Sequence, residues 1–183
     1  MLQRAGVDVV VYACMASSLV DAGKWERETT ERTGLPSTTA ANATKEALRA
    51  VGAHSVALVC HYAEDRLGPL NDSFESDGFT VVSIETASVT GVNDMNRIPA
   101  EEIYRMARKA DCPEADALCI LATNLRSFPI LQQLEEDLGK PVISTNQAIL
   151  WKALQLVGIK PDIKGYGRLL SGDIAQLAEA GQR

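Results

Sequence analysis

Histidine and cysteine are scarce in this chain, and their scarcity limits its metal and disulfide chemistry. The 183 residues include only two histidines, His54 and His61, so a histidine-rich metal site is excluded. The cysteine spacings fit neither a zinc motif nor the disulfide framework of a small secreted domain. These residues are Cys14, Cys60, Cys112 and Cys119. We therefore expect reduced thiols in a cytoplasmic protein without a metal site.

Other signatures of common protein classes are missing as well. No apolar run approaches the roughly 18 residues of a membrane span, and the start, MLQRAGVDVV, lacks the features of a signal peptide. Neither GxGxxG nor GxxxxGK[ST] occurs, so a nucleotide phosphate loop has no support. The net charge is −6 and the pI about 5.0, which disfavours nucleic acid. We expect neither a membrane nor a nucleic acid as a partner.

The chain does contain a regular alternation of short apolar runs and helical segments. Its apolar fraction of 46% is enough to bury a substantial core. The runs are rich in Val and Ile, which is typical of parallel strands separated by helices. We predict strands at residues 7–13, 36–39, 55–60, 79–84, 116–121 and 141–144. We predict helices at residues 25–34, 42–52, 64–78 (interrupted at Gly68-Pro69), 99–110, 128–139 and 146–158.

The same order of elements occurs twice along the chain. VDVVVYAC at residues 7–14 lines up with ADALCILA at 115–122, and GLPSTTAANA at 34–43 lines up with GKPVISTNQA at 139–148. The period is too long for a solenoid, so we interpret it as a domain duplication. The predicted parts are residues 1–52 as a partial first α/β half, 53–170 as the second half, and 171–183 as a helix or tail.

The two halves differ in length. The second half has two predicted strands before residues 116–121, whereas the first has none before residues 7–13. If the halves were equivalent, roughly 50–60 residues would be missing from the front of the first one. A truncated gene product and a family member with a smaller first half both account for the difference.

Two equivalent junctions lie beyond the predicted strands, at the edge where open α/β sheets bind ligands. Cys14 follows the first strand, and Ala122 stands at the matching place in the second half. Pseudo-two-fold symmetry would bring both to one cleft, as in a site with a thiol on each side of the substrate; here the second thiol is missing. Backbone amides after Cys14 would favour a thiolate and bind carboxylates. The alternative is that Cys14 is a small buried apolar residue.

Several small polar residues near these junctions are candidates for binding carboxylate groups. Thr123 and Asn124 follow Ala122, and Thr39 holds the related place in the first half. Helix capping is the alternative role for such residues, and we expect it for Asn146.

Three further residues lie in loops at the same edge. Tyr62 follows the strand at residues 55–60 and could donate a hydrogen bond or a proton at the mouth of the cleft. The adjacent His61 is a second candidate for proton transfer, but we expect it to be a solvent-facing loop residue. Asn93 lies in the loop after residues 79–84 and either lines the site or serves as an ordinary turn residue.

These segments together resemble the aspartate/glutamate racemase superfamily, and within it the branch of maleate cis-trans isomerase and arylmalonate decarboxylase. The segments that carry the resemblance are VDVVVYAC, SVALVCHY, RIPAEEIY, DALCILATNLR and GKPVISTNQAILWKAL. The resemblance implies an α/β fold of two tandem pseudo-symmetric Rossmann-like (flavodoxin-like) parallel-sheet units, the first lacking its N-terminal strands. It also implies a cleft between the units, no cofactor, and a homodimer or larger homo-oligomer.

The resemblance assigns roles to individual residues. Cys14 falls where the first-half cysteine belongs, Tyr62 on the active-site tyrosine, and Ala122 where the second cysteine belongs. The implied substrate-binding residues are Met15, Ala16, Thr39, Asn93, Thr123 and Asn124.

The activity implied is that of a cofactor-independent, maleate cis-trans isomerase-like enzyme acting on a small mono- or dicarboxylic acid. The Cys14 thiolate would add to the double bond, and rotation followed by elimination would give the trans isomer. Because Ala122 replaces the opposing cysteine, we expect impaired turnover; acid–base catalysis is typically worth about 10²–10⁴-fold. The alternatives are an Asp/Glu-type racemase, an arylmalonate-decarboxylase-like lyase, or an inactive metabolite-binding relative. The lyase matches poorly because its single cysteine belongs to the second half.

Overall fold

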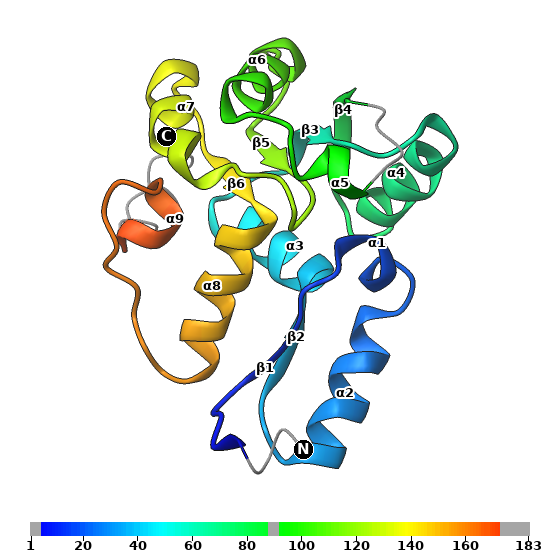
Figure 1. Cartoon of the computed structure of the whole chain (residues 1–183), viewed down its shortest axis with the longest axis vertical. Helices are drawn as coiled ribbons and strands as arrows, with labels where there is room; N and C mark the ends of the chain where they lie inside the picture. Colours follow the sequence, from blue (N-terminus) through cyan, green and yellow to red (C-terminus); the bar gives the residue numbers. More distant parts are fainter. Residues whose placement is uncertain (1–4, 88–91, 173–183) are drawn as a thin grey trace.

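The structure is a computed structural model that describes residues 5–87 and 92–172, and its strands form two parallel sheets (Figure 1). The first sheet pairs β1 (Val10–Tyr12) with β2 (Ser37–Thr39). The second has the order β4-β3-β5-β6. Its strands are β3 (Ser55–Cys60), β4 (Thr80–Thr86), β5 (Ala117–Ile120) and β6 (Val142–Ser144). Each predicted strand is present, and the α/β fold with parallel sheets is confirmed.

Helices connect the strands, as the alternating pattern predicts. They are α1 (Met15–Ser18), α2 (Ala22–Thr33), α3 (Ala40–Ala50), α4 (Leu67–Glu75), α5 (Val92–Met95), α6 (Ala100–Ala110), α7 (Leu131–Leu138), α8 (Thr145–Leu156) and α9 (Arg168–Ser171), with the 3₁₀ turns η2 (Glu64–Arg66) and η3 (Phe128–Ile130). The four-residue helices α1, α5 and α9 are not among the predicted elements. A single turn is too short to show a 3.6-residue period.

Alternate residues of the second sheet face two separate cores. Val56, Leu58 and Cys60 of β3 belong to a buried cluster with α3 and α4. Ala57 and Val59 belong to a second cluster with α6 and α7 on the opposite face. This alternation follows from the two-residue period of a strand, and it explains why β3 is apolar throughout.

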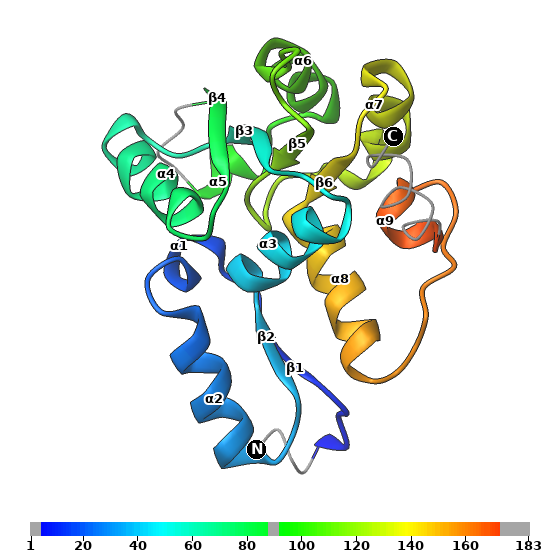
Figure 2. The ribbon, with the colours of Figure 1, turned by 180° about the vertical axis from the view of Figure 1, so that it is seen from behind.

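Two helices cross between the sheets. Helix α3 follows β2 of the first sheet, yet its Ala47 and Leu48 are buried with residues of the second sheet. Helix α8 follows β6 of the second sheet and contacts α3, β1 and β2. Figures 1 and 2 show α3 between the two sheets from both sides. The division at residue 52 stays a prediction, and the predicted tail at 171–183 lies almost wholly outside the described residues.

Matching glycines support the internal repeat. Gly34 ends α2 and Gly139 ends α7, with φ angles of 71° and 69°. An L-amino acid rarely adopts this left-handed conformation, so glycine is the favoured residue after the helix. Gly34 is the C-cap of α2 and Gly139 is the C-cap of α7, so the helices before the two aligned segments end in the same way.

The predicted interruption of the helix at Gly68-Pro69 is wrong. These residues form the first turn of α4, which begins at Leu67. Amides in a first helical turn have no acceptor within the helix, so the missing N–H of Pro69 is tolerated there. Within the described residues, no helix has the length and apolar character needed to cross a membrane.

Candidate active site

Cys14 lies two residues beyond β1, at the start of α1. Its Sγ is 3.1 Å from the Oγ of Ser17, whose hydroxyl can donate a hydrogen bond to a thiolate. Cys14 is half-buried, whereas Cys60 and Cys119 are buried in the core, where burial raises the pKa of both thiols. Cys14 is therefore better placed to react than either core cysteine, and the alternative of a buried Cys14 is wrong.

Tyr62 follows β3 and lies near Cys14. Burial raises the pKa of Tyr62 well above its usual range, and the neighbouring Cys60 and Cys14 raise it further. The phenol therefore keeps its proton at neutral pH and can donate a hydrogen bond. Ala16 of α1 and Tyr62 line the same pocket, so the helix after β1 and the loop after β3 lie side by side.

Ala122, at the junction after β5, has an unusual backbone. Its φ is 119°, and it is the one non-glycine with a positive φ among the described residues. Such strain typically amounts to about 1–3 kcal/mol and persists only where the surroundings enforce it. Ala122 is buried, and its N–H donates to the Oγ1 of Thr145 at 3.4 Å. The two junctions match in sequence but differ in backbone, since the φ of Cys14 is −127°.

His61 is buried, so the prediction of a solvent-facing loop residue is wrong. It is 6% exposed, its Nε2 lies 3.0 Å from the Oδ1 of Asn124, and its ring packs edge-on against Tyr62. Because Val59 of β3 pairs with Ile120 of β5, residues that follow these neighbouring strands meet at one sheet edge. The sequence gives no sign of this contact, because the two partners are far apart along the chain.

The predicted candidate Thr39 is held by other side chains. Its Oγ1 accepts a hydrogen bond from Asn42 N, which caps α3. Its N–H and Oγ1 both donate to Glu26 Oε1, at 2.7 and 3.1 Å. Thr39 is fully buried, so the capping alternative describes its observed contacts.

The other capping prediction is wrong. Ser144, not Asn146, caps α8, in a capping box with Gln147. Asn146 lies in the first turn of the helix, and its Nδ2 donates to Thr123 O at 2.9 Å. This bond ties the loop after β5 to α8 and helps to fix the backbone around Ala122.

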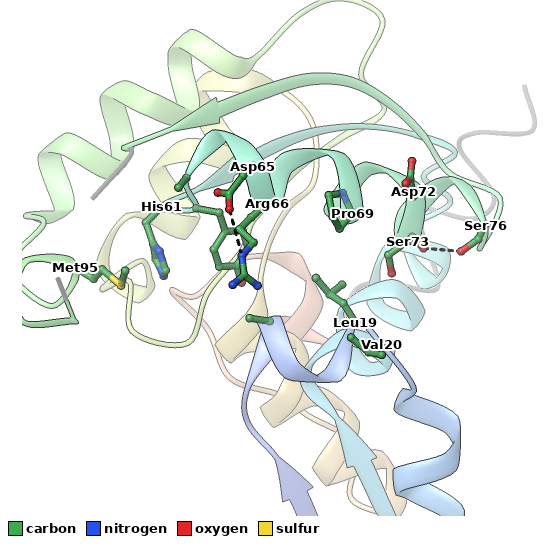
Figure 3. Close-up of a pocket in the computed structure, with 13 residues that line it drawn as sticks. Leu19, Val20, His61, Asp65, Arg66, Pro69, Asp72, Ser73, Ser76 and Met95 are labelled. Atoms are coloured by element: carbon green, nitrogen blue, oxygen red, sulfur yellow. Dashed lines mark hydrogen bonds and ion pairs between the residues drawn. The ribbon is translucent and has the colours of Figure 1, made fainter. Parts of the chain in front are cut away.

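A pocket of about 900 Å³ opens beside His61 and Tyr62 (Figure 3). Two predicted residues, Ala16 of α1 and Tyr62, line it, together with His61. Cys14, Ala122, Thr39, Thr123 and Asn124 are not among its lining residues, and the side chain of Met15 is buried in the core. The remaining lining residues are Leu19, Val20, Ala63, Asp65, Arg66, Pro69, Asp72, Ser73, Ser76 and Met95.

The sequence analysis does not predict that residues of α4 line this pocket. Pro69, Asp72 and Ser73 do so, but no sequence motif distinguishes them from other residues on a helix surface. Asn93 belongs to α5, but its side chain lies outside the described part of the structure. Met95, from the same short helix, does line the pocket.

Comparison with known proteins identifies the family. The protein-family model for arylmalonate decarboxylase matches residues 2–170. The chain belongs to the arylmalonate decarboxylase family. A maleate isomerase of Nocardia farcinica is 29% identical over 184 residues, covering 95% of this chain and 73% of the relative. An arylmalonate decarboxylase of Bordetella bronchiseptica is 30% identical over 142 residues, covering 76% of this family member and 59% of the relative.

A solved structure of one maleate isomerase resembles this chain over most of its length. It is a cysteine-to-serine variant of the Nocardia farcinica maleate cis-trans isomerase with a covalently bound succinylcysteine intermediate. The TM-score is 0.87 at 30% identity, covering 93% of this family member and 74% of that chain. The predicted resemblance to maleate isomerases and arylmalonate decarboxylases is confirmed.

Proposed function

We propose that this family member is a cofactor-independent isomerase that acts on a small mono- or dicarboxylic acid, such as maleate, through the Cys14 thiolate. The observation that carries the proposal is the position of Cys14, which is half-buried, lies 3.1 Å from the Ser17 hydroxyl, and is two residues from Ala16 in the wall of the pocket that Tyr62 also lines. The maleate isomerase relatives and the succinylcysteine intermediate of one of them support a thiol-addition reaction.

The chemistry requires only the thiolate and proton-handling groups. The thiolate forms a C–S bond to one alkene carbon, and the π electron pair moves to the neighbouring carbon and its carboxylate. The protonated Tyr62 can stabilise that developing charge through a hydrogen bond. Rotation about the new single bond, followed by C–S cleavage, releases the trans acid and regenerates the thiolate. The substrate-binding roles remain predictions for Met15, Ala16, Thr39, Asn93, Thr123 and Asn124.

The first experiment combines mass spectrometry with turnover of maleate. We expect an adduct of one maleate on Cys14, fumarate formation by the unaltered chain, and a further gain in kcat in Ala122→Cys. The physical reason is that a thiol at residue 122 supplies an acid–base group that alanine lacks.

The matched controls are two other thiol substitutions. Cys14→Ser should abolish both the adduct and turnover. Cys112→Ser should leave both unchanged, because Cys112 is half-buried and packs against the core cluster with α6 and α7. Absence of both adduct and fumarate, in the unaltered chain and in Ala122→Cys, would contradict a maleate isomerase.

A carbon–carbon lyase is the second candidate. Leu19, Val20, Pro69 and Met95 give the pocket an apolar wall that suits an aryl group, and the decarboxylase of Bordetella bronchiseptica is a relative. Carbon dioxide release from an arylmalonate, faster than fumarate formation from maleate, would favour the lyase over the isomerase.

A further inference from the structure

His61 has a buried nitrogen that nothing in the proposed reaction yet uses. The residue is 6% exposed, and its Nδ1 is buried with no hydrogen-bond partner among the described residues. Buried polar atoms nearly always have a partner, so an unpaired one in a pocket wall calls for an explanation.

The hydrogen bond to Asn124 determines which imidazole nitrogen is free. The carbonyl Oδ1 of Asn124 can only accept, so Nε2 of His61 carries a proton and donates it across 3.0 Å. In the neutral ring, Nδ1 therefore holds a lone pair, which is the group that a general base needs. Asn124 acts here as a positioning residue, which fixes the tautomer and the orientation of the ring.

The imidazole lies on the second-half side of the site. It lines the pocket together with Ala16, which is two residues from Cys14, and packs against Tyr62. Figure 3 shows the His61 side chain between Met95 and Arg66, and the Arg66 side chain pointing toward α1. The anchor of His61, Asn124, is two residues from Ala122, the place where the sequence predicts a second proton-handling thiol.

We propose that His61 is the second proton-handling residue of this site, in the role that the methyl group of Ala122 cannot perform. The inference rests on the proposed isomerase function and identifies a further catalytic residue for it. It predicts that the unaltered chain has a working acid–base partner for Cys14, supplied by an imidazole instead of a thiol.

The proposed cycle conserves protons and electrons. Nδ1 accepts the proton that the Cys14 thiol releases, directly or through one water molecule. The thiolate adds to the alkene, and the imidazolium gives its proton to the carbanion, which yields an S-succinyl thioether. The succinylcysteine intermediate on the Nocardia farcinica relative is a thioether of this kind. After rotation, neutral His61 removes a proton from that carbon as the C–S bond breaks.

The other titratable or charged side chains of the pocket are less suited to this role. Burial raises the pKa of Tyr62, so the phenol holds its proton too firmly to exchange it at neutral pH. Asp65 and Arg66 are exposed and face each other at 3.9 Å, and Asp72 is exposed on α4. His61 alone among these lining groups combines burial with a free lone pair.

The decisive variant is His61→Gln, which keeps a hydrogen-bonding side chain beside Asn124 but cannot take up a proton. We expect kcat to fall by about 10²–10⁴-fold, with KM changed by no more than a few fold. His54→Gln is the matched control, since His54 is exposed and lies just before β3, at the opposite end of the strand. It should leave both constants unchanged.

Adding Ala122→Cys to His61→Gln provides a rescue that a merely structural role of His61 would not allow. If the thiol replaces the imidazole as acid and base, the kcat of the double variant should be at least tenfold higher than that of His61→Gln alone. His61→Asn serves as a second substitution if the glutamine side chain disturbs folding, which circular dichroism would reveal.

Alkylation by iodoacetamide tests the coupling of Cys14 and His61 without any substrate. At pH 7 we expect Cys14 to react several-fold faster in the unaltered chain than in His61→Gln, because the imidazole takes the thiol proton. Cys112, also half-buried, is an internal reference that should react equally in both, as resolved by peptide mass spectrometry.

The outcomes separate the two proposals. Fumarate formation and Cys14 alkylation that are both insensitive to His61→Gln would overturn the role of His61 and leave the isomerase intact. No fumarate and no maleate adduct in the unaltered chain would overturn the isomerase. The alkylation rates would then decide alone: a slower Cys14 in His61→Gln supports the imidazole as its proton partner, and equal rates refute it.

Discussion

At the scale of single residues, the contacts that matter here join positions far apart in the sequence. The positions of Cys14 and Tyr62 beyond strands follow from the sequence, because the residues after a parallel strand lie at the carboxyl edge of its own sheet. The burial of His61 is not predictable in this way, since it depends on Asn124 in the loop after another strand. The positive φ of Ala122 is equally invisible, because alanine carries no sequence signal for such a conformation.

The strain at Ala122 leads to a prediction about stability. Glycine adopts a φ of 119° at little steric cost, so Ala122→Gly should raise the free energy of unfolding by about 1 kcal/mol in urea titrations. Ala117→Gly is the matched control: Ala117 is buried in β5, outside the residues with a positive φ, and the change should be destabilising. If both substitutions destabilise equally, the backbone at residue 122 is not strained.

At the scale of elements, strands and long helices follow from the sequence, whereas single turns do not. The strand at residues 55–60 is predicted to the residue, because both faces are buried and its apolar run ends where the loop begins. Pro69 of α4 leads to the wrong prediction of an interrupted helix. A proline is tolerated in the first turn and disruptive further along, and the sequence does not define where the helix begins. Contacts between helices also cannot be predicted without the structure, and those of Lys45 are an example.

Lys45 joins α3 to the end of α4. Its Nζ is buried and donates to Ser73 O, Ser73 Oγ and Asp77 Oδ2. Burial alone would raise the pKa of Asp77, but the hydrogen bonds and charges of Lys45 and Arg49 lower it below its usual range. A carboxylate with a lowered pKa stabilises the fold above its unfolded pKa of about 3.9, and this contribution is lost as the pH falls through the folded pKa.

We therefore expect Asp77→Asn to lower the free energy of unfolding at pH 7 and to make stability less dependent on pH below 4. Because the Asp77 side chain is 40% exposed, the loss should be about 1 kcal/mol. Urea unfolding at pH 7 and pH 3 measures both effects. Glu75→Gln, on the exposed side of α4, is the control and should change neither. A variant as pH-sensitive as the unaltered chain would show that Asp77 does not carry this dependence.

At the scale of the whole molecule, the crossing of α3 and α8 ties the two sheets together. Buried residues of α3 pack on the second sheet, while α8 contacts both strands of the first. Separating the halves would expose these apolar surfaces to water. The sequence repeat predicts two units but not this exchange of helices, which arises only when the units pack. The predicted homodimer or larger assembly remains a prediction, which sedimentation velocity would test.

The two tryptophans allow the cooperativity of the halves to be measured. Trp25 stacks on Tyr12 of β1, and Trp151 is buried in α8. We expect Trp25→Phe and Trp151→Phe, each leaving a single fluorescent reporter, to unfold at the same urea concentration as their circular dichroism signal. An earlier transition reported by Trp25 alone would support residues 1–52 as an independent domain.

The φ of Ala122 has one further consequence, for comparing side chains at that position. Serine, cysteine and alanine meet the same backbone penalty there, so exchanging them alters the chemistry without altering the main-chain cost. Rates measured across such a series, with His61 present and absent, would form a double-mutant cycle. The cycle would yield the coupling energy between the two proton-handling positions on an unchanged scaffold.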